Sequence, residues 1–230
     1  MKRTIALLLT LAMLLSLTAC FKKGEKAFDN SQEAFDCVTA AYLSTNTFSE
    51  DIYEAWYLGV NSKFDYNEAT EFAAFAAKMH IEQTHIEEAV ARLSGKSEFE
   101  ASQWASLSLR YDGSYFSAWV SVVSEAYKCS GKTVEIEAQL NAAKKAMKAL
   151  GDEYSDYEHY PALKEYFTNT MAFYDFCCHP EGSFEQVVET FNAYRNTARE
   201  CFFDLNYVFD DSIRGLSAYD DAEEEEEDEE

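Results

Sequence analysis

Apolar residues recur at helical spacing along nearly the whole chain, and few residues interrupt that pattern. Only two prolines and eight glycines occur in 230 residues. No segment alternates apolar and polar residues as a half-buried strand would. Helices separated by glycine and polar turns are the natural product of such a sequence. The sequence therefore predicts an all-α fold.

The clearest helix is predicted over residues 184–208. Its apolar positions step alternately by three and four residues, which is a heptad seam of three and a half repeats. The seam consists of Phe184, Val187, Phe191, Tyr194, Ala198, Cys201, Leu205 and Val208. Ser183, followed by Gln186 three residues later, forms a capping-box pattern at its start.

Two antiparallel helical hairpins are expected in the second half of the chain. A helix that begins near Pro161 and stops at the turn 179–182 should pair with the helix over 184–208. Its expected apolar stripe is Leu163, Phe167, Thr170 or Met171, Tyr174 and Cys177. The other hairpin comprises a helix over 116–127, a turn at 129–132 and a helix over 136–150.

The first half of the chain predicts four further helices, over residues 31–45, 49–61, 66–94 and 97–111. The total is about seven or eight amphipathic helices joined by short loops, which implies an amphipathic helical bundle. The tyrosine-rich loop 151–160 is the best candidate for an internal boundary. Periodicity leaves open whether the helices form one bundle or two.

The first twenty residues have the features of an export signal. A basic start is followed by an apolar run of about 13 residues, from Ile5 to Leu17, whereas a membrane-spanning helix needs roughly 20. The run ends in Leu17-Thr18-Ala19-Cys20, which resembles the lipobox of bacterial lipoprotein precursors. The resemblance covers only the export segment. It implies cleavage before Cys20 and a diacylglycerol on its thiol; the alternative is an ordinary signal cut after Ala19.

The lipobox divides the chain into four expected parts. Residues 1–19 are the signal peptide, 20–30 a lipidated cysteine with a polar tether, 31–216 the helical bundle domain and 217–230 a disordered acidic tail. Acyl chains on Cys20 would anchor the protein almost irreversibly. The expected location is the cell membrane, with the bundle facing outside the cytoplasm.

A large negative charge limits the partners of the chain. The net charge is −23, cleavage of the signal removes Lys2 and Arg3 to give −25, and ten acidic residues lie in 220–230. Such a surface repels phosphate backbones, which excludes nucleic acid as an expected partner. The tail itself is interpreted as a solvated, self-repelling end, with a cation-collecting or partner-binding arm as the alternative.

The cysteine count argues against a disulfide framework. Lipidation of Cys20 would leave five cysteines, and an odd number cannot all pair within one chain. In the last hairpin Cys177 and Cys201 would lie roughly 24 Å apart along the helix axes, whereas a disulfide needs Cα atoms within ~7 Å. Buried free thiols are therefore expected at Cys37, Cys129, Cys177, Cys178 and Cys201.

One segment has the spacing of a metal site. Glu82-Gln83-Thr84-His85 matches the Glu-x-x-His element of di-iron bundles, in which both side chains share a helix face. Such a site needs a second copy, and the only near match, Asp156-Tyr157-Glu158-His159, falls in a predicted loop. A solvated face or a polar layer is the favoured interpretation, and no cofactor is predicted. The candidates that remain for a metal are His80, Glu82 and His85.

Other residue groups are assigned structural roles. Trp56, Trp104 and Trp119 are expected in the core, and Lys144, Lys145 and Lys148 on an exposed helix face. The loop 152–160 lacks the register of a calcium site and is expected to be a half-buried connection. There is no Gly-x-Ser-x-Gly elbow and no phosphate-binding glycine loop. Adjacent Cys177, Cys178 and His179 do not by themselves make a thiolate–imidazole pair.

These observations favour a non-enzymatic lipoprotein whose bundle contacts another envelope protein or acts as a scaffold. A bundle that binds a small molecule or a metal ion at the envelope is the alternative. A hydrolase is the third class and has the least support.

Overall fold

A computed structural model describes residues 2–61, 68–110 and 115–209. In this part of the chain every regular element is a helix, so the predicted all-α fold is confirmed. The helices are α1 (Lys2–Asn61), α2 (Glu68–Ala76), α3 (Gln83–Leu93), α4 (Ala101–Arg110), α5 (Tyr115–Cys129), α6 (Lys132–Tyr154), α7 (Tyr160–Cys178) and α8 (Phe184–Phe209).

Helix α1 is one continuous helix, so the prediction of separate helices over 31–45 and 49–61 is wrong. The polar residues between those segments bond within the helix instead of ending it. Thr47 Oγ1 donates to the Leu43 carbonyl at 3.2 Å, and Ser49 Oγ donates to the Asn46 carbonyl at 2.7 Å. Phe48 lies between them and is buried.

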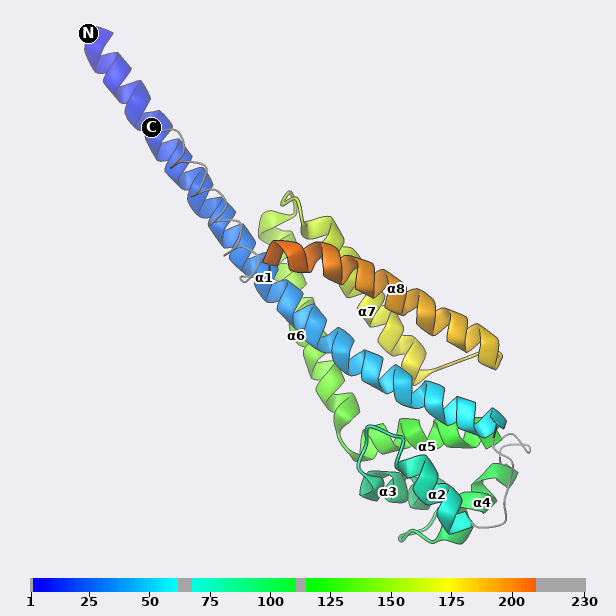
Figure 1. Ribbon diagram of the computed structural model, residues 1–230. Coiled ribbons are helices and arrows are strands. Elements are labelled where there is room, and N and C mark those ends of the chain that lie inside the picture. Colours follow the sequence, from blue (N-terminus) through cyan, green and yellow to red (C-terminus); the bar gives the residue numbers. More distant parts are fainter. Residues whose placement is uncertain (1, 62–67, 111–114, 210–230) are drawn as a thin grey trace, which may run out of the picture.

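The segment expected to be a polar tether also belongs to α1. Residues 24–30 are helical, and Ala27 is buried against the bundle. The N-terminal part of α1 projects beyond the other helices (Figure 1). Among the described residues, no helix combines the length and the apolar character needed to span a bilayer. The tail 217–230 and the side chain of Cys20 lie outside the described residues.

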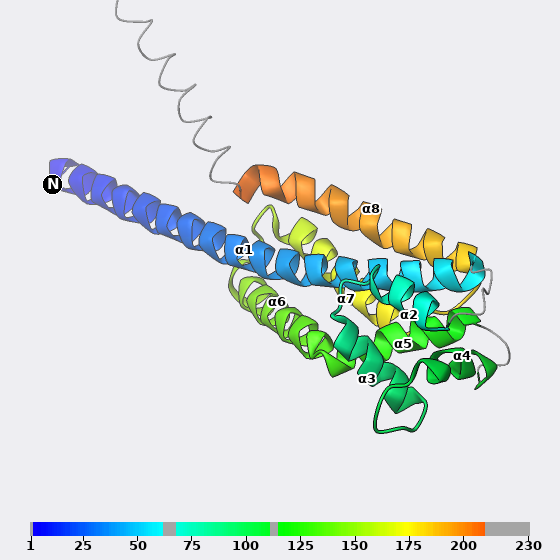
Figure 2. The same cartoon turned by 60° about the horizontal axis from the view of Figure 1, so that its bottom comes forward.

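Four long helices, α1, α6, α7 and α8, run through most of the molecule, and α2 to α5 cover one end (Figures 1 and 2). Helices α7 and α8 pack as the predicted antiparallel hairpin. Helix α8 ends beside the point where α1 leaves the bundle, and the rings of Phe28 and Phe209 are 5.4 Å apart there. This end is called the proximal end, and the end with α2–α4 is called the distal end.

The core formed by the described residues consists of two clusters stacked along the long helices. The distal cluster joins α1–α5 to the first half of α6, the end of α7 and the start of α8. The proximal cluster is made by α1, α6, α7 and α8 alone. Leu150 and Tyr154 before the loop 151–160 pack in the same cluster as Leu163 and Tyr166 after it. The loop therefore does not separate two cores.

The turn between α5 and α6 was placed correctly, but the two helices do not form a hairpin. Gly131 occupies the N-cap of α6 with φ of 78°, a left-handed conformation that glycine adopts without a Cβ penalty. Beyond the turn, α6 diverges from α5 and packs mainly along α1 (Figure 1). The large buried face of α1 accounts for this preference.

The predicted helix over 66–94 is interrupted. Residues 77–82 form turns between α2 and α3. Met79 and Ile81 of this segment are buried. The backbone N–H of His80 donates a hydrogen bond to the carboxylate of Asp51 on α1. These contacts replace the helical bonds that a continuous helix would make.

Candidate functional site

A groove of about 410 Å³ lies between α1 and α8. Residues spaced by three or four positions on each helix share a face, and two such faces form its walls. Its lining consists of Tyr42, Asn46 and Glu50 from α1, and Asn192, Arg195, Asn196, Arg199, Phe202 and Phe203 from α8. We call it the α1–α8 groove.

Arg195 is held in this groove by neutral partners. Its Nε donates to Asn46 Oδ1 at 2.9 Å, and its Nη2 donates to Ser49 Oγ at 2.7 Å. Ser49 is fully buried, and the guanidinium also lies over the Phe191 ring, 5.8 Å from its centroid. The position of the guanidinium is therefore fixed without neutralising its charge.

Arg199 lies one turn further along the same wall. Its guanidinium is 5.4 Å from the centroid of the Phe203 ring. Phe203 is 58% exposed, and Leu43, also 58% exposed, follows Tyr42 on the opposite helix. The groove thus combines cationic and exposed apolar side chains.

Neither Arg195 nor Arg199 has a carboxylate within salt-bridge distance among the described residues. Glu50 lines the groove, but its Oε1 accepts the Asn46 Nδ2 at 2.8 Å. Burial raises the pKa of the Tyr42 phenol, the charges of Arg195 and Arg199 oppose the rise, and the charge of Glu50 adds to it. Both positive charges therefore act at the same position in the groove.

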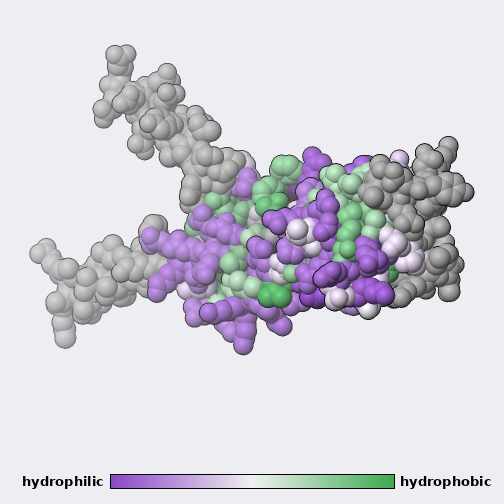
Figure 3. Space-filling model, turned by 90° about the horizontal axis from the view of Figure 1, so that it is seen from below, coloured by the Kyte–Doolittle hydropathy of each residue, from purple (hydrophilic) through white to green (hydrophobic). Residues whose placement is uncertain are grey.

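This pair of arginines stands out on a strongly acidic molecule. The chain has 42 acidic and 19 basic residues. Hydrophilic residues dominate the face drawn in Figure 3, and apolar residues form separate patches there. A guanidinium without a carboxylate partner is well suited to bind an incoming carboxylate, because its planar donors match both oxygens.

A second polar site lies in the distal half, around the buried carboxylate of Asp51. Its oxygens accept the His80 backbone N–H at 3.0 and 3.1 Å, and its Oδ1 lies 2.7 Å from His80 Nδ1. The Tyr127 hydroxyl donates to Oδ2 at 3.0 Å. Burial raises the pKa of Asp51, and the hydrogen bonds from His80 and Tyr127 oppose the rise.

Lys132 completes this arrangement from the first turn of α6. Its Nζ donates to the His80 carbonyl at 2.6 Å and lies 5.6 Å from the Tyr127 ring centroid. The cluster thus joins α1, the 77–82 turns, α5 and α6. Its geometry supports a structural role, because its polar groups form hydrogen bonds with one another. We call this cluster of Asp51, His80, Tyr127 and Lys132 the clasp.

Comparison with protein-family models, curated proteins and solved structures gives no match for this chain.

The three candidate metal ligands do not come together. The expectation that Glu82 and His85 share a helix face is wrong, because α3 begins at Gln83 and Glu82 is its N-cap. His80 lies in the preceding turn and is bonded to Asp51. Within the described ranges, no group of three His, Cys, Asp or Glu side chains could hold a metal ion.

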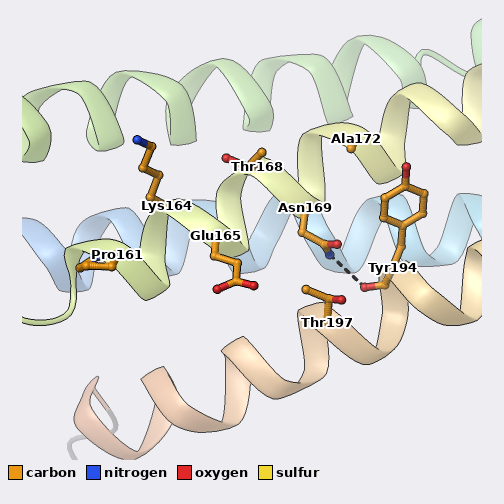
Figure 4. A pocket seen from close by; sticks show the side chains of 8 residues that line it. All are labelled: Pro161, Lys164, Glu165, Thr168, Asn169, Ala172, Tyr194 and Thr197. Atoms are coloured by element: carbon orange, nitrogen blue, oxygen red, sulfur yellow. Dashed lines mark hydrogen bonds between the residues drawn. The ribbon is translucent and has the colours of Figure 1, made fainter.

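A larger groove, of about 550 Å³, lies between α7 and α8 (Figure 4). Lys164 and Glu165 come from α7, and Tyr194 and Thr197 from α8. Asn169 donates its Nδ2 to the Tyr194 carbonyl at 2.9 Å, which joins the two helices. The rest of its lining is Pro161, Thr168 and Ala172.

Most residues assigned structural roles lie as predicted. Trp56, Trp104 and Trp119 are buried, and Lys144, Lys145 and Lys148 are exposed. The five described cysteines are free, but only Cys177 and Cys201 are buried, in different core clusters, whereas Cys37, Cys129 and Cys178 are half-buried. The prediction of buried thiols is therefore confirmed for two of the five. Tyr157 in the loop after α6 and Tyr160 at the start of α7 are half-buried.

Sequence analysis missed both polar sites. The sequence did not indicate a buried Asp51, because a single carboxylate beside apolar residues predicts an exposed position on an amphipathic helix. Arg195 and Arg199 carried a weak signal: they are spaced by one turn on the helix with the clearest seam. Their partners on α1 are about 150 residues away in sequence, so no local pattern could identify them.

Proposed function

We propose that this protein is a non-enzymatic, lipid-anchored binding module outside the cytoplasm, and that it engages another envelope protein through the α1–α8 groove. The observation that carries the binding role is the uncompensated pair Arg195 and Arg199 on an otherwise acidic molecule. Exposed Phe203, whose ring lies beside Arg199, supplies apolar contact area.

The sequence Leu17-Thr18-Ala19-Cys20 supports the anchor. Seven helical residues separate Cys20 from buried Ala27, which corresponds to about 10 Å along the helix axis. An anchor at Cys20 would therefore hold the proximal end close to the bilayer. The distal end would point away from the membrane, because α1 runs through the bundle as one helix.

The groove has the shape and chemistry for a protein segment. Two helices side by side form the kind of wall that holds an amphipathic helix or an extended peptide. Arginine and aromatic side chains are also the residue types that carry most binding energy at protein interfaces. An acidic partner segment with apolar residues would match both features.

Site-specific cross-linking in the native host tests this role. A photoreactive benzophenone amino acid would replace Asn192 in the groove or, as a control, exposed Asn141 on α6. We expect one host protein to be cross-linked from position 192 and not from position 141, and Arg199→Glu to weaken that product. Equal products from both positions, or none from position 192, would contradict the proposal.

A second candidate is supported by the α7–α8 groove. Its volume of about 550 Å³ lies in the range of small-molecule sites, roughly 300–1,000 Å³. Native mass spectrometry of the full chain with Ala172 intact or changed to Trp tests this role. A small molecule bound to the natural chain and lost from Ala172→Trp would favour it. No bound molecule on the natural chain, or the same added mass on both chains, would count against it.

A further inference from the structure

We propose that the acidic C-terminal segment, residues 220–230, binds in the α1–α8 groove of its own chain and covers Arg195 and Arg199. This inference uses the groove but does not require the proposed envelope partner. If both are correct, the partner has to displace the segment before it can bind.

Charge is the first argument. Of the described residues that line the groove, two carry a positive charge and only Glu50 a negative one. The segment 220–230 contains ten acidic residues. Carboxylates near an unpaired guanidinium gain charge-assisted hydrogen bonds, whereas the acidic remainder of the surface repels them. The groove is therefore a favourable position for this segment.

The length of the chain beyond α8 is the second argument. Arg199 and Arg195 lie 10 and 14 residues before Phe209, which places them about 15 and 21 Å from the end of the helix. Asp220 follows Phe209 by 11 residues, which can span up to ~36 Å. The acidic residues can therefore reach both arginines of the same chain.

The order of residue types is the third argument. From the end of α8 back along the groove wall, exposed Phe203 comes first, followed by Arg199 and then Arg195. Along the chain beyond Phe209, a linker that contains Asp210, Asp211 and Arg214 comes first. Leu216 and Tyr219 follow this linker and directly precede the acidic run from Asp220. If the segment runs back over α8, its apolar residues lie near Phe203 and its acidic residues lie near the two arginines.

Tethering makes a weak interaction sufficient. A segment attached by a short connection has an effective concentration in the millimolar range. If the free segment bound the groove with a dissociation constant of about 1 mM, the tethered segment would occupy the groove in roughly half of the molecules. The attraction between exposed charges is screened by salt, so occupancy should fall as ionic strength rises.

Photo-cross-linking of the purified full chain tests the proposal. A benzophenone amino acid replaces Asn196 in the groove or Asn141 on α6. After illumination at low salt, we expect position 196 to link to the tryptic peptide 215–230 within one chain. Position 141 should give little of this product, and ~0.5 M salt should suppress it.

Two variants of the full chain identify the interacting charges. With the probe at position 196, Arg199→Gln should lower the yield about three- to fivefold, and replacing residues 223–230 with glutamines should lower it at least as far. Lys144→Gln, which removes an exposed charge on α6 outside both grooves, is the matched control and should leave the yield unchanged. Circular dichroism checks that each variant remains helical.

Three results would overturn the proposal. The first is no link to residues 215–230 from position 196, or an equal yield from position 141. The second is a link that joins two chains, which would make the occupant a second copy's tail. The third is a yield that is insensitive to Arg199→Gln, to neutralisation of residues 223–230 and to salt.

Discussion

Asp51 shows how one buried polar residue can determine local structure. Its carboxylate accepts bonds from the backbone and ring of His80 and from the Tyr127 hydroxyl. The cost of burying the charge is offset by these donors. The same bonds hold the 77–82 turns against α1, which explains why α2 and α3 are separate helices.

Replacing Asp51 tests this role. Asp51→Ala leaves the His80 N–H and the Tyr127 hydroxyl without their acceptor, so we expect the free energy of unfolding to fall by about 3 kcal/mol. Chemical denaturation followed by circular dichroism measures the change. Exposed Asp204→Ala is the matched control and should shift stability by less than ~0.5 kcal/mol. A similar effect of the two changes would refute the clasp.

Thiol reactivity tests the burial of individual cysteines. Burial raises the pKa of the Cys177 thiol well above its usual value, and the residue is fully buried. At about pH 8 we expect Cys177 to be alkylated more than about tenfold more slowly than half-buried Cys37. Mass mapping after timed alkylation gives the rates, and the difference should vanish in denaturant. Equal rates in the folded protein would contradict the burial.

At the scale of elements, the sequence predicted helices better than it predicted their ends and partners. The helix predicted over 136–150 lies within α6, and its apolar residues Ile136, Leu140, Ala143, Met147 and Leu150 are buried. On α7, however, Tyr166 and Phe173 are buried while Met171 is exposed. Leu163, Thr170 and Cys177 of the predicted stripe are buried, but Tyr166 and Phe173 take the places expected for Phe167 and Tyr174. Two adjacent stripes are apolar at these positions, and only the contacts with α1 and α8 decide between them.

The capping box of α8 gives a direct test at this scale. Gln186 N–H donates to Ser183 Oγ at 3.3 Å, and Ser183 N–H donates to Gln186 Oε1 at 2.8 Å, as predicted. Ser183→Ala should therefore lower the free energy of unfolding by about 1 kcal/mol. Exposed Ser155→Ala, outside any N-cap, should have a smaller effect. Denaturant unfolding of both variants measures the free energies of unfolding. Equal decreases in the two variants would contradict the capping role of Ser183.

At the scale of the whole molecule, the fold class followed from local patterns, whereas the functional site did not. The number of helices in the described residues agrees with the prediction only because two errors cancel: α1 had been divided in two, and α2 and α3 had been joined. The α1–α8 groove depends on Asn46 and Ser49 meeting Arg195, and the clasp depends on Asp51 meeting His80. Both pairings arise only when distant segments pack. The continuity of α1 was missed for a related reason: buried Phe48 and its neighbours favour a helix through a polar segment.

The buried tyrosines predict how stability depends on alkaline pH. Burial raises the pKa of Tyr166 above its ordinary value, so above pH ~10 the unfolded chain releases a proton that the folded chain keeps. The free energy of unfolding should therefore fall by about 1.4 kcal/mol per pH unit for this residue. Tyr166→Phe should reduce the slope of stability against pH by that amount, and Tyr207→Phe, which is 71% exposed, should not. Denaturation at a series of alkaline pH values supplies the slopes, and an unchanged slope in Tyr166→Phe would refute the assignment.

The proposal that the chain is a lipid-anchored binding module is tested most directly by native mass spectrometry of the protein, extracted gently from its own host's membrane. We expect a chain that begins at Cys20, carries a diacylglycerol and retains a second protein. A chain without lipid, or a lipidated chain that carries a metal ion or small molecule and no protein, would contradict the account.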